Sequence, residues 1–527
     1  AKPLHRDKSA SSNVKILIEA QSFLKQGLIL AIKGIGGFHL ACDAQNAAAV
    51  SRLRQRKLRV DKPFALMMPD IEMIQRHCEV TENEAALLSS RERPIVLLEK
   101  RPGTSIAPEV APCQAYWGVM LPYSPLHYLL FATLPGQTTP PPAVLVMTSG
   151  NISEEPIAID NDDARRRLAP LADVFLMHDR PIRTRCDDSV YRLFSMNESK
   201  TTHTIFPIRR SRGFAPSHLI LPWKGPPTLA TGPELKNTVC LTRDNYAFLS
   251  HHIGDMENYE TLLSFEDCIR QFERLFRITP KAIACDMHPN YLSTRYAQER
   301  AESEGLYKLE IQHHHAHIAA CMAENSLSGA QPVIGVSLDG TGYGDDGTIW
   351  GGEFLLADYS GYQRIYHWRS TPLPGGDAAI RKPARIALAY LHDADIEWDE
   401  RLPPAQEFSQ NELAILKNQL IRQINTPRTS SLGRLFDAVA AIAGVRQEVN
   451  YEAQAAIEFE MMADSRPTLA IYPYCLQEEE IDFRPVIRQI VQEMLEGASA
   501  STISTKFHLT LAECIIRICL NMREMFH

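Results

Sequence analysis

Four histidines fall within five positions near the middle of the chain, in the stretch IQHHHAHIAACMAEN. The Ala-rich residues that follow predict a helix, on which residues four apart share one face. His313 and His317 have this spacing and can reach one metal ion, whereas His314 and His315 are rotated away. We therefore predict that His313 and His317 are metal ligands. Cys321 on the same face is an alternative third ligand, and a solvated helix start without metal is the alternative to the whole site.

A strand, a Gly-rich turn and a second strand are predicted in VIGVSLDGTGYGDDGTIWGGEF. Glycine lets backbone N–H groups face a phosphate, and an aspartate in such a turn can hold a cation. No helix follows the glycines and GxxxxGK[ST] is missing, which argues against a P-loop and a Rossmann fingerprint. The alternative is a tight turn with acidic surface residues. The candidate phosphate-binding residues are Asp339, Gly340, Thr341, Gly342 and Gly344, with Asp339 also the nearest carboxylate candidate for the metal site.

Two later stretches add candidates of the same kind. In TPLPGGDAAIRKPARIALAYL, a turn at Gly375 and Gly376 precedes a predicted helix with basic residues in its opening turns. In SSLGRLFDAVAAIAGV, an amphipathic helix carries Asp437 among apolar residues. Asp437 is either a ligand contact or a polar group at the edge of the core.

A run of basic residues in the first half of the chain, LRQRKLRVDKPFALM, precedes an apolar strand. Such a run is often only a solvated helix face. Lys57, Arg59 and Lys62 can instead hold phosphates, because a guanidinium forks onto phosphate oxygens and an ammonium offers a point charge.

A buried-looking strand in VLVMTSGNISEEP ends at small polar residues, Thr148, Ser149 and Asn151. Ligands of α/β sheets collect at the carboxyl ends of strands, where such residues let a phosphate or sugar approach backbone N–H groups. The alternative is an ordinary Asx or Ser turn.

Strand-like apolar runs bounded by Gly or Pro alternate with longer helical patterns, which predicts a mixed α/β (α+β) fold. The Arg-rich and Pro-rich stretches IRRSRGFAP and LPWKGPP indicate a boundary. We therefore predict one domain over residues 10–216 and a second over residues 217–527. The second is expected to open with two strands joined by a turn at Arg243–Asn245.

The composition is that of an ordinary globular protein, with 527 residues of which 45% are hydrophobic and 22% charged. A formal net charge of -8 argues against nucleic acid or a membrane surface as a partner and suits small anionic substrates better. Scattered cysteines without a CxxC pair favour a reducing compartment, and no signal-like or membrane-spanning apolar run is visible. The expected location is the cytoplasm.

The motifs of the first half resemble the YrdC/TsaC family. The resemblance rests on the KxR and SxN patterns quoted above, on AIKGIGGFHLACDA and on TRCDDSVYR, over about two hundred residues. It implies a twisted-sheet domain that binds ATP and forms carbamoyl-type adenylates. The residues expected to bind nucleotide or phosphate are Lys57, Arg59, Lys62, Thr148, Ser149, Asn151, Ser189, Arg209 and Arg210.

The second half resembles the Kae/TsaD family, a branch of the actin/hexokinase/Hsp70 superfold, in HPNYLSTRYA, HHHAHIAA, DGTGYGDDGTIWGGEF and GRLFDAVAAI. This resemblance implies a two-lobed domain that closes around a nucleotide and takes two metal ligands from the HxxxH pair. Both halves joined through RRSRGFAP resemble the HypF family of carbamoyltransferases from about Val14 onward.

The resemblance to the HypF family implies a sequence of reactions. Carbamoyl phosphate is hydrolysed in an acylphosphatase domain, and the YrdC-like domain joins the carbamate to AMP with release of pyrophosphate. The last domain transfers the carbamoyl group to the C-terminal cysteine of the partner HypE. The implied cofactors are ATP, Mg²⁺ and one zinc or iron ion in the second domain, since histidines with carboxylates suit both metals.

Two features expected for this family are missing from the sequence. No acylphosphatase signature or CxxC zinc-finger array precedes the YrdC-like part, and no Gly-Gly nucleotide motif or final Asp metal ligand follows the last helix. We therefore expect an incomplete second lobe, with adenylation better preserved than transfer and no phosphatase activity. The alternative functions are a fusion enzyme for tRNA threonylcarbamoylation and a non-catalytic nucleotide-binding scaffold.

Overall fold

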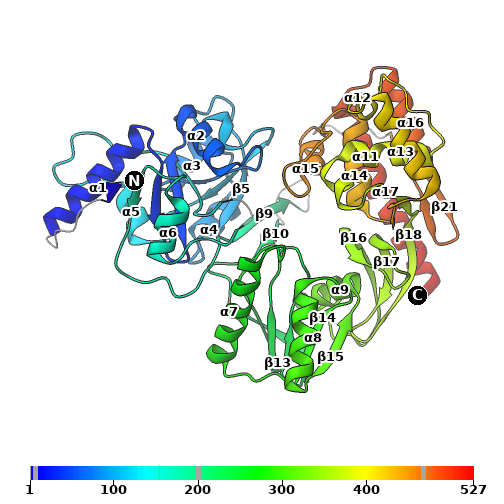
Figure 1. Cartoon of the computed structure of the whole chain (residues 1–527), viewed down its shortest axis with the longest axis horizontal. Coiled ribbons are helices and arrows are strands. Elements are labelled where there is room, and N and C mark those ends of the chain that lie inside the picture. Colours follow the sequence, from blue (N-terminus) through cyan, green and yellow to red (C-terminus); the bar gives the residue numbers. More distant parts are fainter. Residues whose placement is uncertain (1, 4–9, 153–154, 196–202, 465–469, 527) are drawn as a thin grey trace. The chain divides into compact units, whose positions relative to one another are not determined.

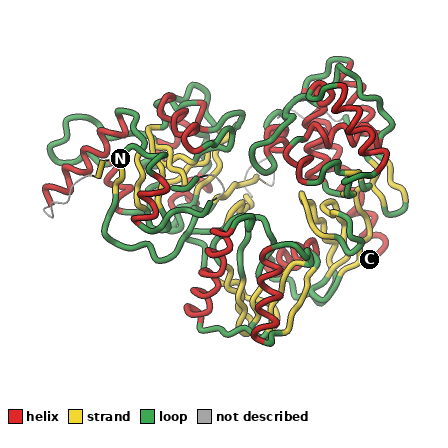
Figure 2. Tube along the Cα trace, in the orientation of Figure 1, coloured by secondary structure: helices red, strands yellow, loops and turns green. Residues whose placement is uncertain are grey.

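The computed structural model of the protein describes residues 2–3, 10–152, 155–195, 203–464 and 470–526. Helices and strands occur throughout, which confirms the predicted mixed α/β class (Figures 1 and 2). The described chain packs into two compact units. Unit 1 comprises residues 1–219, 223–285 and 290–309, and unit 2 comprises residues 220–222, 286–289 and 310–527. Within the described ranges, no helix has the length and apolar character needed to cross a membrane.

One large mixed sheet forms the first part of unit 1. Among the described residues its strand order is β1-β8-β2-β3-β7-β4-β6-β5-β9-β10. The antiparallel pair β3 and β7 lies in its middle and aligns His39 with Ser149. The strands are β1 (Lys2–Pro3), β2 (Leu30–Lys33), β3 (Phe38–Asp43), β4 (Ala65–Met67), β5 (Ile95–Glu99), β6 (Tyr116–Met120), β7 (Leu145–Ser149), β8 (Val174–Leu176), β9 (Val190–Ser195) and β10 (His203–Arg209).

Helices cover both faces of this sheet, because successive strand residues point to opposite sides. Leu40 and Cys42 of β3 belong to one apolar core, and Ala41 between them belongs to another. The first core also holds residues of α2 (Ala47–Lys57), α3 (Ile71–His77), α4 (Glu82–Ser89) and α6 (Asn161–Leu168). The second holds residues of α1 (Ala10–Lys25) and α5 (Pro125–Phe131), and a short 3₁₀ helix spans Pro108–Val110.

A second sheet, in the order β11-β13-β12-β14-β15, follows in the chain. Its core is closed by apolar residues of α7 (Tyr259–Phe276) and α8 (Leu292–Glu304). The predicted turn at Arg243–Asn245 is confirmed, because the N–H of Ser250 donates to the backbone oxygen of Val239 at 2.8 Å and the segment Cys240–Leu249 therefore folds back on itself. Asp244 takes a left-handed backbone conformation at this turn, with φ 56°. The strands are β11 (His218–Gly225), β12 (Thr228–Ala230), β13 (Cys240–Leu249), β14 (Ala282–Asp286) and β15 (Tyr307–Ile311).

Unit 2 contains a third sheet built around a long hairpin. β16 and β17 pair antiparallel, as predicted. The predicted turn is placed differently, because Asp339, Gly340, Thr341 and Gly342 lie inside β16, at a shift of the pairing register, and the chain turns at residues 344–348. Helix α9 (His313–Glu324) packs against both strands (Figure 1). The strands are β16 (Val333–Tyr343), β17 (Ile349–Ala357), β18 (Tyr362–Trp368), β19 (Thr371–Pro372), β20 (Arg428–Thr429), β21 (Cys475–Gln477) and β22 (Glu480–Asp482).

The remaining helices of unit 2 form a bundle around one large apolar core (Figure 2). The single helix predicted after Gly376 is instead two helices, since Pro383 cannot continue the first and begins the second. The helices are α10 (Asp377–Arg381), α11 (Pro383–Asp393), α12 (Pro403–Gln406), α13 (Gln410–Arg422), α14 (Leu432–Ile442), α15 (Gln454–Glu460), α16 (Arg484–Leu495) and α17 (Ala500–Phe526).

Candidate anion site and metal centre

Lys57 is the last residue of α2, and its side chain ends at the turn after β7. Its Nζ donates to the backbone oxygen of Ser149 at 2.6 Å, and to the backbone oxygen and Oδ1 of Asn151 at 2.8 and 2.6 Å. The Ser149 hydroxyl donates to the same Oδ1 at 2.8 Å. The structure therefore brings the two separate patterns that begin at Lys57 and Ser149 into one place.

Arg59 lies at the same place and carries the second cation. Its Nη1 donates to the hydroxyl of Thr148 at 3.1 Å, and its Nε donates to the backbone oxygen of Lys62 at 3.0 Å. Burial and the nearby cations Arg54 and Arg209 lower the pKa of Arg59 to about 9. Burial likewise lowers the pKa values of Lys57 and Lys62, with Arg59 as a further cause. This excess of positive charge around the buried Lys57 favours an anionic ligand.

The other first-domain candidates make contacts that hold the chain in place. Ser189 is fully buried, accepts the N–H of Ser211 at 2.8 Å and donates to the backbone oxygen of Arg212 at 2.9 Å. Arg210 donates to the backbone oxygens of Phe214 and Ser217. Both contacts tie down the segment that leaves the first sheet.

Arg209 pairs with Asp187 at 2.9 Å. Its positive charge helps to lower the pKa values of Arg59 and Lys62. Sequence reasoning missed the neighbouring Asp188, which is bound by Arg212 Nε at 2.7 Å and by His39 Nε2 at 3.3 Å. The adjacent aspartates in TRCDDSVYR were the signal that could have found it.

A cavity of about 2000 Å³ also lies in unit 1, on different residues. Its wall includes Lys33, Gly34, Cys186, Arg212 and His251. None of the nine nucleotide-binding candidates of the first domain belongs to the wall as the described residues define it. Volume alone therefore does not identify the place where the predicted residues gather.

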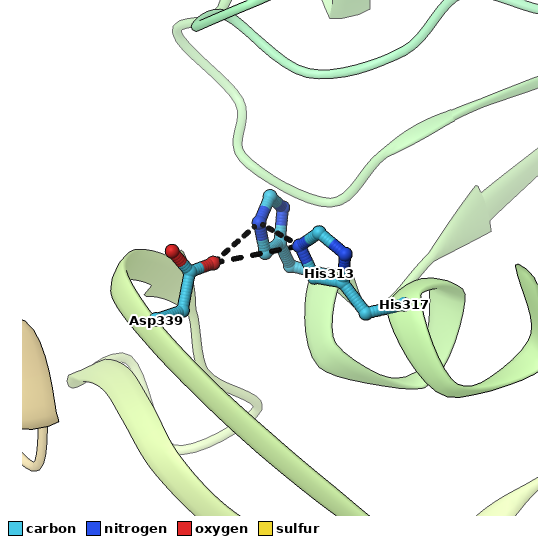
Figure 3. A group of neighbouring side chains, drawn as sticks. All are labelled: His313, His317 and Asp339. Carbon is cyan, nitrogen blue, oxygen red and sulfur yellow. Dashed lines mark hydrogen bonds and ion pairs between the residues drawn. The ribbon is translucent and has the colours of Figure 1, made fainter. Parts of the chain in front are cut away.

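The histidine stretch begins α9, with Gln312 as its N-terminal cap, accepting the N–H of His315 at 2.9 Å. His313 and His317 are one helical turn apart and their Nε2 atoms are 3.2 Å apart. Oδ2 of Asp339, on β16, lies 3.0 Å from Nε2 of His313 and 3.5 Å from Nε2 of His317 (Figure 3).

Within the described residues, His313, His317 and Asp339 form the group of side chains that could hold a metal ion. Cys321, the alternative third ligand, is not in this group. Two imidazoles and one carboxylate, with ligand atoms within 4.8 Å of one another, are a donor set that fits a zinc or iron ion. The three donor atoms converge, as a shared ion requires.

The protonation of this group follows from its contacts. Burial opposes a charge on His313, but hydrogen bonds to Asp286 and Asp339 outweigh it and raise the pKa of His313 to about 9. Burial would raise the pKa of Asp339, but the hydrogen bonds with His313 and His317 bring it well below its usual value. A cation between these carboxylates is therefore favoured, whether it is a proton on His313 or a metal ion.

Asp286, the last residue of β14, was not predicted from the sequence. Its Oδ2 lies 2.6 Å from Nδ1 of His313, and its side chain is 5% exposed. The position of an aspartate at the end of the apolar strand AIACD is a weak signal that could have found it.

The Gly-rich end of β16 fits closely against α9 and α14. A Cβ on Gly342 would collide with the imidazole of His314 and lie 3.0 Å from Cδ2 of His313. A Cβ on Gly433 would lie 3.1 Å from Cα of Gly340. A Cβ on Gly344, which directly follows β16, would collide with the indole of Trp350. The glycines therefore allow close packing beside the metal ligands. Thr341 donates to the backbone oxygen of Gly340 at 2.7 Å.

The remaining candidates lie in local structural contacts. Gly375 and Gly376 have φ values of +94° and +55°, which permit the turn before α10. Asp437 pairs with Arg434 at 2.9 Å within α14, and burial, partly offset by Arg434, raises the pKa of Asp437 to about 6. The nucleotide-binding role of Gly375, Gly376 and Asp437 stays a prediction.

Three protein families match successive parts of the chain. The model described as "Telomere recombination", which covers Sua5, YciO and YrdC, matches residues 22–203. The HypF Kae1-like domain matches residues 224–324, and the second subdomain of the carbamoyltransferase Kae1-like domain matches residues 335–527. Fold and sites thus define a protein that joins a YrdC-like domain to a Kae1-like domain.

Curated relatives that align with most of the chain identify its family more closely. The chain is 45% identical over 463 residues to carbamoyltransferase HypF2 of Cupriavidus necator and 42% identical over 495 residues to carbamoyltransferase HypF of Rhizobium leguminosarum bv. viciae. These alignments cover 86% and 94% of this chain, but 56% and 62% of the relatives.

A crystal structure of full-length HypF in a phosphate- and nucleotide-bound form superposes with a TM-score of 0.89 at 42% identity. The match covers 97% of this chain and 78% of that one. The chain belongs to the HypF family of carbamoyltransferases, as its motifs predicted.

Proposed function

We propose that the first domain, in unit 1, forms a carbamoyl adenylate from ATP and carbamate derived from carbamoyl phosphate. A carboxylate oxygen of carbamate attacks the α-phosphorus of ATP, the bond to the oxygen bridging the β-phosphorus breaks, and pyrophosphate leaves. Membership of the HypF family supports the proposal, as does the phosphate- and nucleotide-bound form of a solved relative.

The observation that carries this proposal is the meeting of Lys57 and Arg59 with the turn from Thr148 to Asn151. The two cations are preorganised by hydrogen bonds to the chain, so they need not reorganise when negative charge develops on the phosphates. Lys62 and Arg209 add positive charge at the same place. Mg²⁺ would accompany the ATP, since it binds phosphates with few protein ligands.

In the same proposal, the second domain transfers the carbamoyl group to the C-terminal cysteine of a HypE-like protein. The thiolate attacks the carbamoyl carbon, the carbon–oxygen bond to AMP breaks, and AMP leaves. The product supplies the cyanide ligand in NiFe-hydrogenase maturation. A carbamoyl adenylate suits this transfer because AMP is a good leaving group, whereas free carbamate decomposes in water.

His313, His317 and Asp339 would hold one zinc or iron ion in the second domain. A bound ion supplies Lewis-acid chemistry, by holding phosphate or polarising the carbamoyl oxygen. Gly340 and Gly342 lie in the strand that carries Asp339, and Gly344 follows it. A phosphate bound there would replace the present acceptors of the Gly340 and Gly344 N–H groups, which are Oδ1 of Asp339 and the backbone oxygen of Thr348.

The decisive experiment is carbamoyl-phosphate-dependent exchange of labelled pyrophosphate into ATP by this chain. A separately added acylphosphatase would supply carbamate. We expect exchange that requires both carbamoyl phosphate and the acylphosphatase, and that is lost in Lys57→Ala. Exchange that depends on threonine and bicarbonate instead would contradict the proposal in favour of tRNA threonylcarbamoylation. The absence of ATP binding would contradict it in favour of a scaffold.

A further inference from the structure

Asp286 lies behind the metal ligands, at the end of β14. Its two carboxylate oxygens have separate partners. Oδ2 lies 2.6 Å from Nδ1 of His313, and Oδ1 accepts the backbone N–H of His288 at 2.8 Å. With 5% of the side chain exposed, the carboxylate is fixed from both sides.

The geometry distinguishes Asp286 from a ligand of the same ion. The two nitrogens of an imidazole ring point away from each other, and Nε2 of His313 faces Asp339 at 3.0 Å and His317 at 3.2 Å. Asp286 is bound to the opposite nitrogen. It can therefore orient the ring, but it cannot reach an ion held by Nε2.

We propose that Asp286 is a positioning residue for the metal centre, which keeps the proton of His313 on Nδ1 and presents the lone pair of Nε2 to the metal. A carboxylate behind a histidine ligand fixes the ring tautomer and orientation and raises the basicity of the ligating nitrogen. The inference rests on the proposed metal site and goes beyond it, because it assigns a role to a residue outside the donor set.

If Asp286 only shaped the turn to His288, a folded Asp286→Asn variant would bind Zn²⁺ as well as the wild type. A positioning role predicts weaker binding, because asparagine cannot replace both carboxylate oxygens. An asparagine has one oxygen and one NH₂ group. If its oxygen keeps the N–H of His288, the NH₂ group donates to Nδ1 of His313 and moves the ring proton to Nε2, which then cannot bind metal. If the oxygen faces His313, the NH₂ group faces the N–H of His288, and because both are donors the hydrogen bond that holds the turn is lost. Asp286→Asn therefore disturbs either the ligand or the turn.

The test is the affinity of the metal-stripped chain for Zn²⁺, measured by competition with a chelator. We expect Asp286→Asn to weaken Zn²⁺ binding about 10- to 100-fold while circular dichroism stays unchanged. The matched control is Asp358→Asn, in the same unit. Oδ1 of Asp358 also accepts backbone N–H groups, from Ser360 and Gly361, whereas His315 is bound to the backbone oxygen of Asp358, which the substitution leaves in place. Unchanged affinity in folded Asp286→Asn would overturn the inference.

A second measurement keeps the inference testable if Asp286→Asn does not fold. Nitrogen-15 NMR of histidine-labelled, Zn²⁺-loaded wild-type chain reports the tautomer of His313, identified by its loss in His313→Ala. A proton on Nδ1 supports the inference, and a proton on Nε2 overturns it. If wild type and His313→Ala bind Zn²⁺ equally, the metal site itself fails. If only Asp286→Asn matches wild type, the positioning role alone fails.

Discussion

The anion site of unit 1 and the metal centre of unit 2 carry opposite imbalances of charge. Around Lys57 and Arg59, burial and neighbouring cations lower the pKa values of both side chains. Around His313, carboxylates raise the pKa of the histidine to about 9 while the pKa of Asp339 falls. The first site is short of negative charge, and the second is short of a cation.

This difference shows that the local arrangement of side chains sets the sign of the charge that a site favours in its ligand. The formal net charge of -8 describes the whole chain and says nothing about the cations gathered around Arg59. Each site holds side chains of like charge close together, which costs stability until a ligand of the opposite sign binds.

The largest expected effect comes from removing one cation of the anion site. Arg59→Ala should lower pyrophosphate exchange about 100- to 1,000-fold, since a preorganised charge near the phosphates is lost. Affinity for Zn²⁺ should not change. The control is Arg76→Ala, which removes an exposed arginine paired with Glu72 on α3. A parallel loss of Zn²⁺ affinity would contradict the separation of the two sites.

Removing a metal ligand should have the next largest effect. His317→Ala should weaken Zn²⁺ binding by at least about 100-fold, because two donors remain instead of three. His315→Ala is a close control, since His315 belongs to the same stretch but is bound to the backbone oxygen of Asp358. Chelator competition measures both. Equal losses in the two variants would show that the histidines act as a polar surface and not as a defined site.

A smaller effect is expected from filling the space beside the ligands. Gly342→Ala should push the imidazoles of His313 and His314 away and cost about 1–3 kcal/mol of stability, as overpacking does. Zn²⁺ affinity should fall as well. Gly361→Ala is the control, because its Cβ would meet open space. Urea unfolding and Zn²⁺ titration of both variants test this, and a stable Gly342→Ala with normal affinity would contradict the close packing.

The smallest expected effect is a pH dependence of the metal-free protein. The folded-state pKa of His313, about 9, exceeds its ordinary value of 6.5, so its protonation stabilises the folded state. This stabilisation is complete below pH 6.5 and is lost as the pH rises through about 9. Urea unfolding of wild type and His313→Gln across this range measures it. The same pH dependence in both proteins would assign it to other groups.

Local patterns predicted a good part of the candidate sites. The spacing of His313 and His317 on a helix places them on one face whatever surrounds it. The residues Arg243–Asn245 predicted the turn of a hairpin for a similarly local reason, since Asp and Asn favour turns. Local signals also misled, as at Gly340 and Gly342, which were predicted to lie in a turn but lie inside β16, at a shift of its register with β17.

By itself, the sequence determined which side chains are available and which near neighbours share a face: the histidine pair, the basic run at the end of α2 and the small residues after β7. Only the tertiary structure decided that Lys57 reaches Asn151, that Asp339 faces the histidines and that Asp286 stands behind His313. These contacts join residues far apart in the chain. They depend on strand pairing and core burial, which bring distant segments together and leave no short-range pattern to recognise.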